Sequence, residues 1–329
     1  MKRASGSLFG LAYGDALGKP TEFLDMVEIE RRYGPGGPRE LAGAPALVTD
    51  DTQMAIAGAD GLLAAGSWTP DAVEPLWRSA FIAWAHSPDN NRAPGMTCLR
   101  AVAALEDGRR WQRATVPGSK GCGANMRVTP VGLLRGVDAD TLAGLAQLQA
   151  GLTHGHPTAL AASELTAYAV RVLCDGAALA DVPALLRERA ETQRRVYRGD
   201  WLGDLWERPG VGAPEEYIER GWVECLAVLD RLDAALAAPD PGADPCLATG
   251  AGWIAEEALA TALYCALLFA DDPVAALGRA AASSGDSDSI AALAGAFLGA
   301  AHGMAAWPAG WDTRIEYGQQ LRGFGDAWD

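Results

Sequence analysis

Two short polar stretches of the sequence carry the residue types that bind divalent metal ions. The first is Thr49–Thr52, which reads TDDT, and the second is Gly285–Ser289, which reads GDSDS. Each opens a segment rich in alanine and glycine, and after the second no polar side chain appears for twelve residues, from Ile290 to Ala301. Carboxylate and hydroxyl oxygens are hard ligands that suit Mg²⁺ or Mn²⁺ better than Zn²⁺. The two stretches therefore suggest a metal site built from oxygen atoms.

Helix capping is the alternative explanation for both stretches, because Asp, Ser and Thr at a helix start accept hydrogen bonds from free backbone N–H groups. In a metal site, the adjacent aspartates of the first stretch would diverge toward two ions, and the alternating aspartates of the second would share one pocket. Buried, unpartnered carboxylates are costly, and two divalent ions about 3.5–4 Å apart would compensate their charge. Spacing alone leaves both explanations open. The candidate metal ligands are Thr49, Asp50, Asp51, Asp286, Asp288 and Ser289.

Glu22 and the two histidines of a later motif are further polar side chains that could belong to a site. Glu22 follows a glycine-rich turn in an apolar stretch, where a carboxylate beside metal ions could orient or deprotonate a water molecule. His154 and His156, in LTHGHPTAL, are two of only four histidines. An HxH pair can bind zinc, but no cysteine or third histidine lies nearby in the sequence. His156 is therefore expected to hydrogen-bond a substrate hydroxyl or phosphate, or to cap the helix that follows.

A glycine-rich stretch in the middle of the chain could bind phosphate oxygens. Gly118, Gly121 and Gly123 expose backbone N–H groups in GSKGCGANMRVTPVGLL, residues 118–134, just before a helical segment. The stretch lacks the GK[ST] ending of a P-loop and follows no clear strand. A plain turn is the alternative. If a diphosphate does bind here, Arg127 could help to offset its charge.

Helical spacing dominates the rest of the chain, and strand signals are sparse. Apolar residues recur at helical intervals in 72–85, 158–174 and 255–270, and many faces carry alanine or glycine, which lets helix backbones approach closely. Proline and glycine clusters predict loops, and the charged, aromatic segment 187–212 is expected at the surface. The pattern predicts an all-α protein, with residues 1–329 forming one domain. The predicted loops are 34–45, 87–95, 115–123, 208–214 and 239–252.

Composition excludes several classes of protein. Apolar residues make up 49% of the 329 residues, which is typical of a globular chain, and the formal net charge of −15 argues against extended nucleic-acid binding. The six cysteines form no CxxC pair, and the longest apolar run is too short to span a membrane. A signal peptide is not apparent, because glycines and Asp15 interrupt the first apolar stretch. The expected setting is soluble and cytoplasmic.

Taken together, these motifs resemble those of the ADP-ribosylglycohydrolase family, which includes dinitrogen-reductase-activating glycohydrolase and the ADP-ribosyl-acceptor hydrolases. They appear in the family's order and span most of the chain. The combination of TDDT with a late DxD before an alanine- and glycine-rich helix is specific. The matching motifs are GLAYGDALGKPTEF (10–23), VTDDTQMA (48–55), RAPGMT (92–97), GCGANMRVTPVGLL (121–134), LTHGHPTAL (152–160) and SSGDSDSIAALAGAFLGAAHG (283–303).

The resemblance implies an all-α fold, a compact single-domain orthogonal helical bundle with a dinuclear metal cleft that holds two Mg²⁺ or Mn²⁺ ions. It implies that the six candidate ligands named above bind the ions, and that Glu22, Asp50 and Asp51 are catalytic. The loop that starts at Gly121 corresponds to the segment that lines the diphosphate of ADP-ribose. Residues implied in substrate binding are Gly121, Cys122, Gly123, Asn125, Met126 and His156.

The implied reaction is metal-dependent hydrolysis of the glycosidic bond between ADP-ribose and an acceptor on an ADP-ribosylated protein, with ADP-ribose as the product. Ala93 stands where some arginine-releasing members have an acid, so the acceptor stays open between arginine, serine, a nucleic-acid end and a small molecule. SGDSDS replaces the frequent GGDTDT and keeps the hydroxyls. The alternatives are another two-metal hydrolase, acting on an ADP-ribose-like or phosphate-ester substrate, and a non-catalytic, crystallin-like binder of ADP-ribose.

Overall fold

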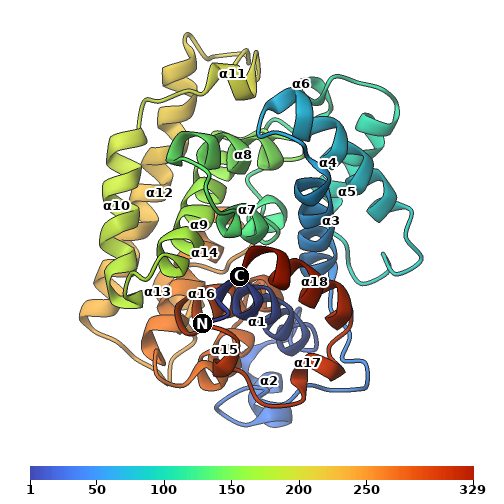
Figure 1. The fold of residues 1–329 in the computed structure, drawn as a ribbon. Helices are drawn as coiled ribbons and strands as arrows, with labels where there is room; N and C mark the ends of the chain where they lie inside the picture. The colour runs from blue at the N-terminus through green and yellow to red at the C-terminus, as the bar shows by residue number, and fades with distance from the viewer.

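The computed structural model describes residues 1–329, which form eighteen α-helices and three short 3₁₀ helices without a β-sheet (Figure 1). Three isolated β-bridges join loops. The predicted all-α class is therefore confirmed. The elements are α1 (Arg3–Gly18), α2 (Met26–Tyr33), α3 (Asp50–Ala64), α4 (Pro70–Ala85), α5 (Met96–Glu106), α6 (Trp111–Ala114), η1 (Cys122–Ala124), α7 (Thr129–Leu133), α8 (Ala139–Gly151), α9 (Pro157–Cys174), η2 (Leu179–Asp181), α10 (Val182–Gln193), α11 (Gly199–Leu202), α12 (Pro214–Ala237), α13 (Cys246–Thr249), α14 (Ala255–Leu268), α15 (Pro273–Ala281), α16 (Ser287–His302), η3 (Met304–Ala306), α17 (Trp311–Arg314) and α18 (Gly318–Trp328).

The antiparallel pair α1 and α16 forms the centre of the molecule, and glycines allow its close packing. A Cβ atom added at Gly14 would lie 1.9 Å from the carbonyl oxygen of Ala291, and one at Gly18 would lie 2.4 Å from the Cα of Asp288. Only residues without a side chain permit such contact between two helix backbones. The end of α1 is therefore held against the start of α16, beside Asp288.

The remaining helices cover this pair on two sides. In Figure 1, α9, α10 and α12 stand on the left and α3, α4 and α5 on the right, with the pair lower down between them and α18 beside α1. One cluster contains 84 of the buried apolar residues, and a second contains only four. Assignment of residues 1–329 to one domain remains a prediction, and the continuous core is consistent with it.

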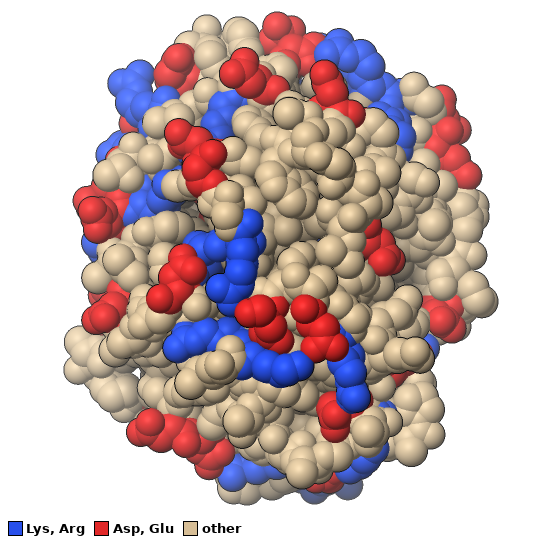
Figure 2. Space-filling view, viewed as in Figure 1, with Lys and Arg blue, Asp and Glu red and all other residues tan.

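The predicted helices 72–85, 158–174 and 255–270 coincide closely with α4, α9 and α14. The predicted loops 34–45 and 87–95 lie between helices, whereas 115–123 runs into η1, 208–214 ends on the first residue of α12, and 239–252 contains the single turn of α13. Acidic and basic side chains alternate over the face shown in Figure 2, and salt bridges join many of them. No helix combines the length and the apolar character that crossing a lipid bilayer would require.

Candidate metal centre and substrate pocket

A cavity of about 320 Å³, here called the acid pocket, opens where α1 ends and where α3 and α16 begin. Ten of the thirteen predicted site residues line it. Its wall also contains residues outside these thirteen, among them Phe23, His154, Trp253 and the segment 93–98. The predicted residues in the wall are Glu22, Asp50, Asp51, Gly121, Cys122, Gly123, Met126, Asp286, Asp288 and Ser289.

Glu22, Asp286 and Asp288 form the tightest group of acids in the pocket. One carboxylate oxygen from each lies within 4.8 Å of the others. The close packing of α1 against α16 explains this convergence, because Glu22 follows the end of α1 and the two aspartates open α16. Three carboxylates at this spacing offer the hard oxygen ligands that Mg²⁺ and Mn²⁺ prefer.

The first aspartate cluster sits at the start of α3 and lines the same pocket. Asp50 Oδ2 accepts a hydrogen bond from the N–H of Gly95 at 3.0 Å. Asp51 is buried, and its Oδ1 atom has no hydrogen-bond partner. A buried carboxylate oxygen without a partner is costly unless a cation compensates it. The oxygen ligand set and this free oxygen therefore fit a divalent cation.

Asp15, which sequence reasoning did not select, holds the start of α3 in place. Its carboxylate accepts hydrogen bonds from the backbone N–H and the hydroxyl of both Thr49 and Thr52. Thr49 Oγ1 donates to Asp15 Oδ1 at 2.8 Å and is the N-cap of α3, so capping and positioning occur together. One sign of this role is visible in the sequence, because Asp15 is an acid within the apolar, glycine-rich segment 3–18, and the structure shows that it is buried.

Burial and mutual repulsion make these acids reluctant to ionise. Burial, followed by the charges of Asp288 and Asp50, raises the pKa of Glu22 to about 9. Burial also raises the pKa of Asp50 and of Asp15 to about 7. At neutral pH some of these carboxyl groups therefore keep their protons. A divalent cation would compete with those protons for the carboxylate oxygen atoms.

The glycine loop forms the wall beside η1. The N–H of Cys122 donates to the carbonyl oxygen of Trp253 at 3.0 Å, so this group already has a partner within the protein. A Cβ atom at Gly123 would lie 2.9 Å from Cys98 Sγ and 3.1 Å from His154 Cε1. Glycine is thus required at position 123 by the close approach of two neighbouring side chains.

Three of the predicted residues do not line the acid pocket. Thr49 binds Asp15 behind it, and Asn125 is buried, donating its Nδ2 hydrogen to the carbonyl oxygen of Ala255 at 3.0 Å. His156 Nδ1 accepts from the N–H of Thr158 at 3.2 Å, which is the capping role anticipated as one alternative. Their roles in binding remain predictions.

His154 is the histidine that lines the pocket. It is buried, and burial, with a smaller contribution from Arg127, lowers its pKa to about 3, so its ring is neutral at physiological pH. Arg127 itself lies below the pocket, where it donates to Gln149 and to Thr153, and its guanidinium stands 4.3 Å from the ring centre of Phe81. Arg127 therefore does not line the cavity, although its charge lies beneath it.

An apolar rim surrounds the mouth of the acid pocket. Phe23, Met96 and Trp253 are 69%, 70% and 44% exposed, and all three line the cavity. The rings of Phe23 and Trp253 are stacked, with centroids 5.8 Å apart and an angle of 17° between their planes. Phe23 adopts a φ of 66°, an uncommon backbone conformation for a residue with a side chain. Such local strain tends to occur at functional sites.

The sequence profile described as ADP-ribosylglycohydrolase matches residues 1–328. The chain belongs to the ADP-ribosylglycohydrolase family. The family assignment and the hydrolase class predicted from the motifs are both confirmed.

Individual relatives of this family align with nearly the whole chain. The ADP-ribosylarginine hydrolase Tri1 of Pseudomonas putida (strain GB-1) is 26% identical, over 98% of this chain and 76% of that protein. The ADP-ribosyl-dinitrogen reductase glycohydrolase of Rhodospirillum rubrum is 28% identical, over 95% and 90%. A solved structure described as an ADP-ribosylglycohydrolase-related protein complex has a TM-score of 0.71 at 24% identity, covers 99% of this chain and 96% of its own, and shares the fold.

In this ADP-ribosylglycohydrolase, a clasp near the C-terminus joins two walls of the acid pocket. Glu316 accepts from Arg92 at 2.5 and 2.9 Å and from the N–H of Val48 at 3.0 Å. Arg92 also donates to the carbonyl oxygen of Val48 at 2.6 Å. Since Val48 precedes the ligand cluster and Arg92 precedes the segment 93–98, the ion pair fixes the distance between those walls.

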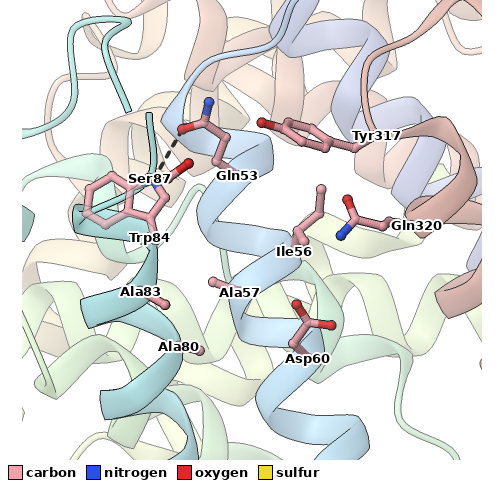
Figure 3. Close-up of a pocket in the computed structure, with 10 residues that line it drawn as sticks. All are labelled: Gln53, Ile56, Ala57, Asp60, Ala80, Ala83, Trp84, Ser87, Tyr317 and Gln320. Carbon is pink, nitrogen blue, oxygen red and sulfur yellow. Dashed lines mark hydrogen bonds between the residues drawn. The ribbon is translucent and has the colours of Figure 1, made fainter. Parts of the chain in front are cut away.

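A smaller cavity of about 210 Å³ lies between α3, α4 and the C-terminal residues Tyr317 and Gln320 (Figure 3). Gln53, Trp84 and Tyr317 meet at its upper end, where Trp84 Nε1 donates to Gln53 Oε1 at 3.2 Å. Gln53 and Tyr317 donate in turn to the carbonyl oxygen and the carboxylate of Asp89. No predicted site residue lines this cavity, and its network supports the loop 87–95 from behind.

Proposed function

We propose that the protein is a metal-dependent ADP-ribosyl-acceptor hydrolase that releases ADP-ribose from an ADP-ribosylated protein. The observation that carries this proposal is the convergence of the two aspartate clusters with Glu22 in one pocket of an ADP-ribosylglycohydrolase. Acidic residues gathered this closely are costly for a fold to bury unless they bind a cation. The names of the relatives given above are consistent with the reaction.

Two Mg²⁺ or Mn²⁺ ions are the proposed cofactors. The oxygen-rich wall and the free Oδ1 atom of Asp51 support this choice. Such ions supply positive charge that polarises oxygen atoms bound to them and offsets the surrounding carboxylates. The residues proposed to hold them are Thr49, Asp50, Asp51, Asp286, Asp288 and Ser289, with Glu22 beside them.

The carboxylates of the pocket are proposed to guide the hydrolysis. The bond between the anomeric carbon of the distal ribose and the acceptor breaks through an oxocarbenium-like state, whose positive charge nearby carboxylates stabilise. Water supplies the hydroxyl group to that carbon and a proton to the departing acceptor. We assign to Glu22, whose pKa depends on the charges around it, the role of accepting the proton of the attacking water. Asp50 and Asp51 are the alternative acceptors of this proton.

Binding of the ADP-ribose diphosphate is assigned to the wall formed by the glycine loop, where Gly121, Gly123 and Met126 face the cavity. Cys98 and His154 occupy the space beside Gly123, so the diphosphate would approach the backbone at Gly121. His154 lies beside Gly123 and is neutral, so it can donate one hydrogen bond to a phosphate oxygen without adding charge.

Arginine is the proposed acceptor. A guanidinium is planar and stacks favourably on aromatic rings, and the exposed pair Phe23 and Trp253 offers such a surface at the mouth of an acidic pocket. The relative from Pseudomonas putida is named for ADP-ribosylarginine. Ala93, which also lines the pocket, supplies no acid to pair with the guanidinium, so the aromatic pair would provide the main recognition.

Release of ADP-ribose from arginine-linked and serine-linked ADP-ribosylated protein, measured with Mg²⁺, with Mn²⁺ and with EDTA, tests the proposal. We expect metal-dependent release from the arginine linkage. Asp286→Ala should reduce turnover on the order of 100-fold or more because a charged ligand is lost, whereas Asp271→Ala, at an exposed aspartate, should not.

The other outcomes separate the rival functions. Release from serine only would contradict the acceptor assignment but not the reaction. Full turnover by Asp286→Ala at saturating metal would contradict the metal site. Binding of ADP-ribose without release from either linkage would favour a non-catalytic binder, and release of phosphate or of a nucleotide instead would favour a phosphate-ester hydrolase.

A further inference from the structure

A second cavity, here called the arginine pocket, lies beside the acid pocket and has a different chemical character. It measures about 370 Å³ and is lined by Arg100, Arg109 and Arg113, by Asp107, and by the segment 114–117. Three guanidinium groups around one cavity are unusual in a chain whose net charge is −15. Lys and Arg side chains also gather at the upper right of Figure 2, on the side where Figure 1 places α5 and α6.

The two pockets share two walls. Helix α5 lines the acid pocket with Met96, Thr97 and Cys98, and Arg100 lies one turn further along, on the side of the arginine pocket. On the second wall, Val116 of the arginine pocket forms a bridge with His154 of the acid pocket. A ligand that leaves the acid pocket along these walls would reach the arginines.

Two of the three arginines have no carboxylate partner. Arg113 contacts Asp204 at 3.0 Å, whereas neither Arg100 nor Arg109 takes part in an ion pair. Arg109 follows the end of α5, where a cation complements the negative end of the helix dipole. That explanation does not apply to Arg100, which lies in the interior of the helix. The charge of Arg100 is therefore available for a ligand.

Thr115 adds an independent sign that a polar ligand is missing. It lines the arginine pocket, is only 4% exposed, and its hydroxyl has no hydrogen-bond partner. Buried hydroxyls nearly always have a partner. This oxygen is buried, so the side chain must turn about its Cα–Cβ bond before a phosphate oxygen in the cavity can accept its hydrogen.

The turn that carries Arg109 is held in position before any ligand binds. Arg78 donates to the carbonyl oxygens of Leu105 and Arg109, each at 3.0 Å, and is itself paired with Glu74 at 2.6 Å. These bonds fix the backbone of the turn, while Arg100 and Arg109 stay exposed to solvent, where a ligand can reach their guanidinium groups.

We propose that the arginine pocket binds an additional phosphate on the adenosine end of the ligand, so that the protein prefers ADP-ribose carrying a phosphate beyond its own diphosphate. Arginine is well suited to this role because its planar fork of N–H groups matches phosphate oxygens. The inference rests on the proposed function, which places the distal ribose in the acid pocket. Arg100 and Arg109 bind the phosphate, and Thr115 donates its hydroxyl hydrogen to it.

Equilibrium binding of ADP-ribose and of 2′-phospho-ADP-ribose, measured by calorimetry with Mn²⁺ present, tests this inference. We expect the wild-type protein to bind the phosphorylated ligand on the order of tenfold more tightly, because hydrogen bonds to charged groups are the strong ones. Added salt should reduce this preference. An ADP-ribose dimer joined through the same ribose shows whether the diphosphate of a following unit can take the place of the phosphate monoester.

The double variant Arg100→Ala, Arg109→Ala should lose the preference and keep its affinity for ADP-ribose. The control is the double variant Arg31→Ala, Arg32→Ala. Both arginines are exposed and pair with Glu28 within α2, away from the arginine pocket, so their loss should leave the preference unchanged. Equal affinity of the wild type for ADP-ribose and for both longer ligands would overturn the inference and leave the proposed function intact. Failure of the wild type to bind ADP-ribose at all would instead overturn the proposed function.

Discussion

Asp15 shows how one buried side chain can organise several others without lining the pocket. Its two oxygen atoms accept hydrogen bonds from four donor groups of Thr49 and Thr52, and these fix the start of α3, where Asp50 and Asp51 line the acid pocket. Residues that orient metal ligands in this way commonly contribute as much as the ligands do. We therefore expect Asp15 to be a positioning residue for the proposed metal site.

Replacement of Asp15 by asparagine should weaken metal binding while preserving the fold. The asparagine amide would offer one acceptor oxygen in place of two, and its hydrogens would face the donors of Thr49 and Thr52. We expect the concentration of Mn²⁺ that gives half-maximal activity to rise on the order of 10- to 100-fold. Asp271→Asn, at an exposed position, is the control. An unchanged Mn²⁺ requirement in Asp15→Asn would show that Asp15 does not position the site.

At the residue scale, the sequence predicted the pocket acids but not the side chains that support them. Adjacent polar letters reveal Asp50 and Asp51, whereas Asp15 lies 34 residues before Thr49 and meets it only in the folded chain. The same limit applies to the histidines, because residues two apart in a turn face different directions, so that His154 lines the cavity and His156 caps α9. Spacing could not decide between them.

At the scale of elements, the packing of α1 on α16 controls the shape of the site. A methyl group at Gly14 would collide with the backbone of Ala291, and backbone cannot move aside cheaply. We expect Gly14→Ala to lower the free energy of unfolding by about 1–3 kcal/mol. It should also weaken metal binding, because α1 would shift relative to α16 and carry Glu22 away from Asp288. Urea unfolding and the Mn²⁺ requirement measure the two effects.

Gly323→Ala provides the matched control, because a Cβ atom at this position of α18 meets nothing within 4 Å. Alanine is the better helix former, so this variant should be as stable as the wild type or up to about 1 kcal/mol more stable. If Gly14→Ala proved equally stable, the close backbone contact between α1 and α16 would not be the constraint inferred here.

The clasp of Arg92 and Glu316 is a second element-scale device. Both side chains are mostly buried, at 14% and 13% exposed, so their ion pair is less screened than one at the surface. Glu316→Gln should leave Arg92 without its charged partner and loosen the segment 93–98, raising KM several-fold with a smaller change in kcat. Asp312→Asn breaks the exposed pair with Arg322 nearby and should change neither constant. Equal effects of both variants on KM would contradict a specific role for the clasp.

Local patterns predicted the long helices, because apolar residues recur at helical intervals in α4, α9 and α14. They could not predict which helices meet. The central pair joins the two ends of the chain, and the acid pocket exists only because of that contact. The apolar rim was also missed, since Phe23, Met96 and Trp253 are scattered through the sequence and look like ordinary core residues until the fold exposes them.

For the whole molecule, the concentration of acids makes stability depend on pH in a defined direction. Folding raises the pKa of Asp15 and Asp50 to about 7 and that of Glu22 to about 9, so these groups bind protons more tightly in the folded state than in the unfolded one. Their contribution to the metal-free protein is fully present below about pH 4 and is lost as the pH rises through about 7 to 9. The metal-free protein should therefore become less stable as the solution becomes alkaline.

Divalent ions should reverse this loss, since they replace the bound protons with positive charge that does not depend on pH. We therefore expect Mn²⁺ to raise the melting temperature more at about pH 8 than at about pH 5, relative to EDTA at the same pH. Thermal unfolding of the wild type with Mn²⁺ or with EDTA, each at both pH values, measures the effect. The variant Asp286→Asn, Asp288→Asn removes two of the proposed ligands and should lose most of the difference between the two pH values. An equal shift by Mn²⁺ at both pH values in the wild type would mean that the ion binds away from these acids.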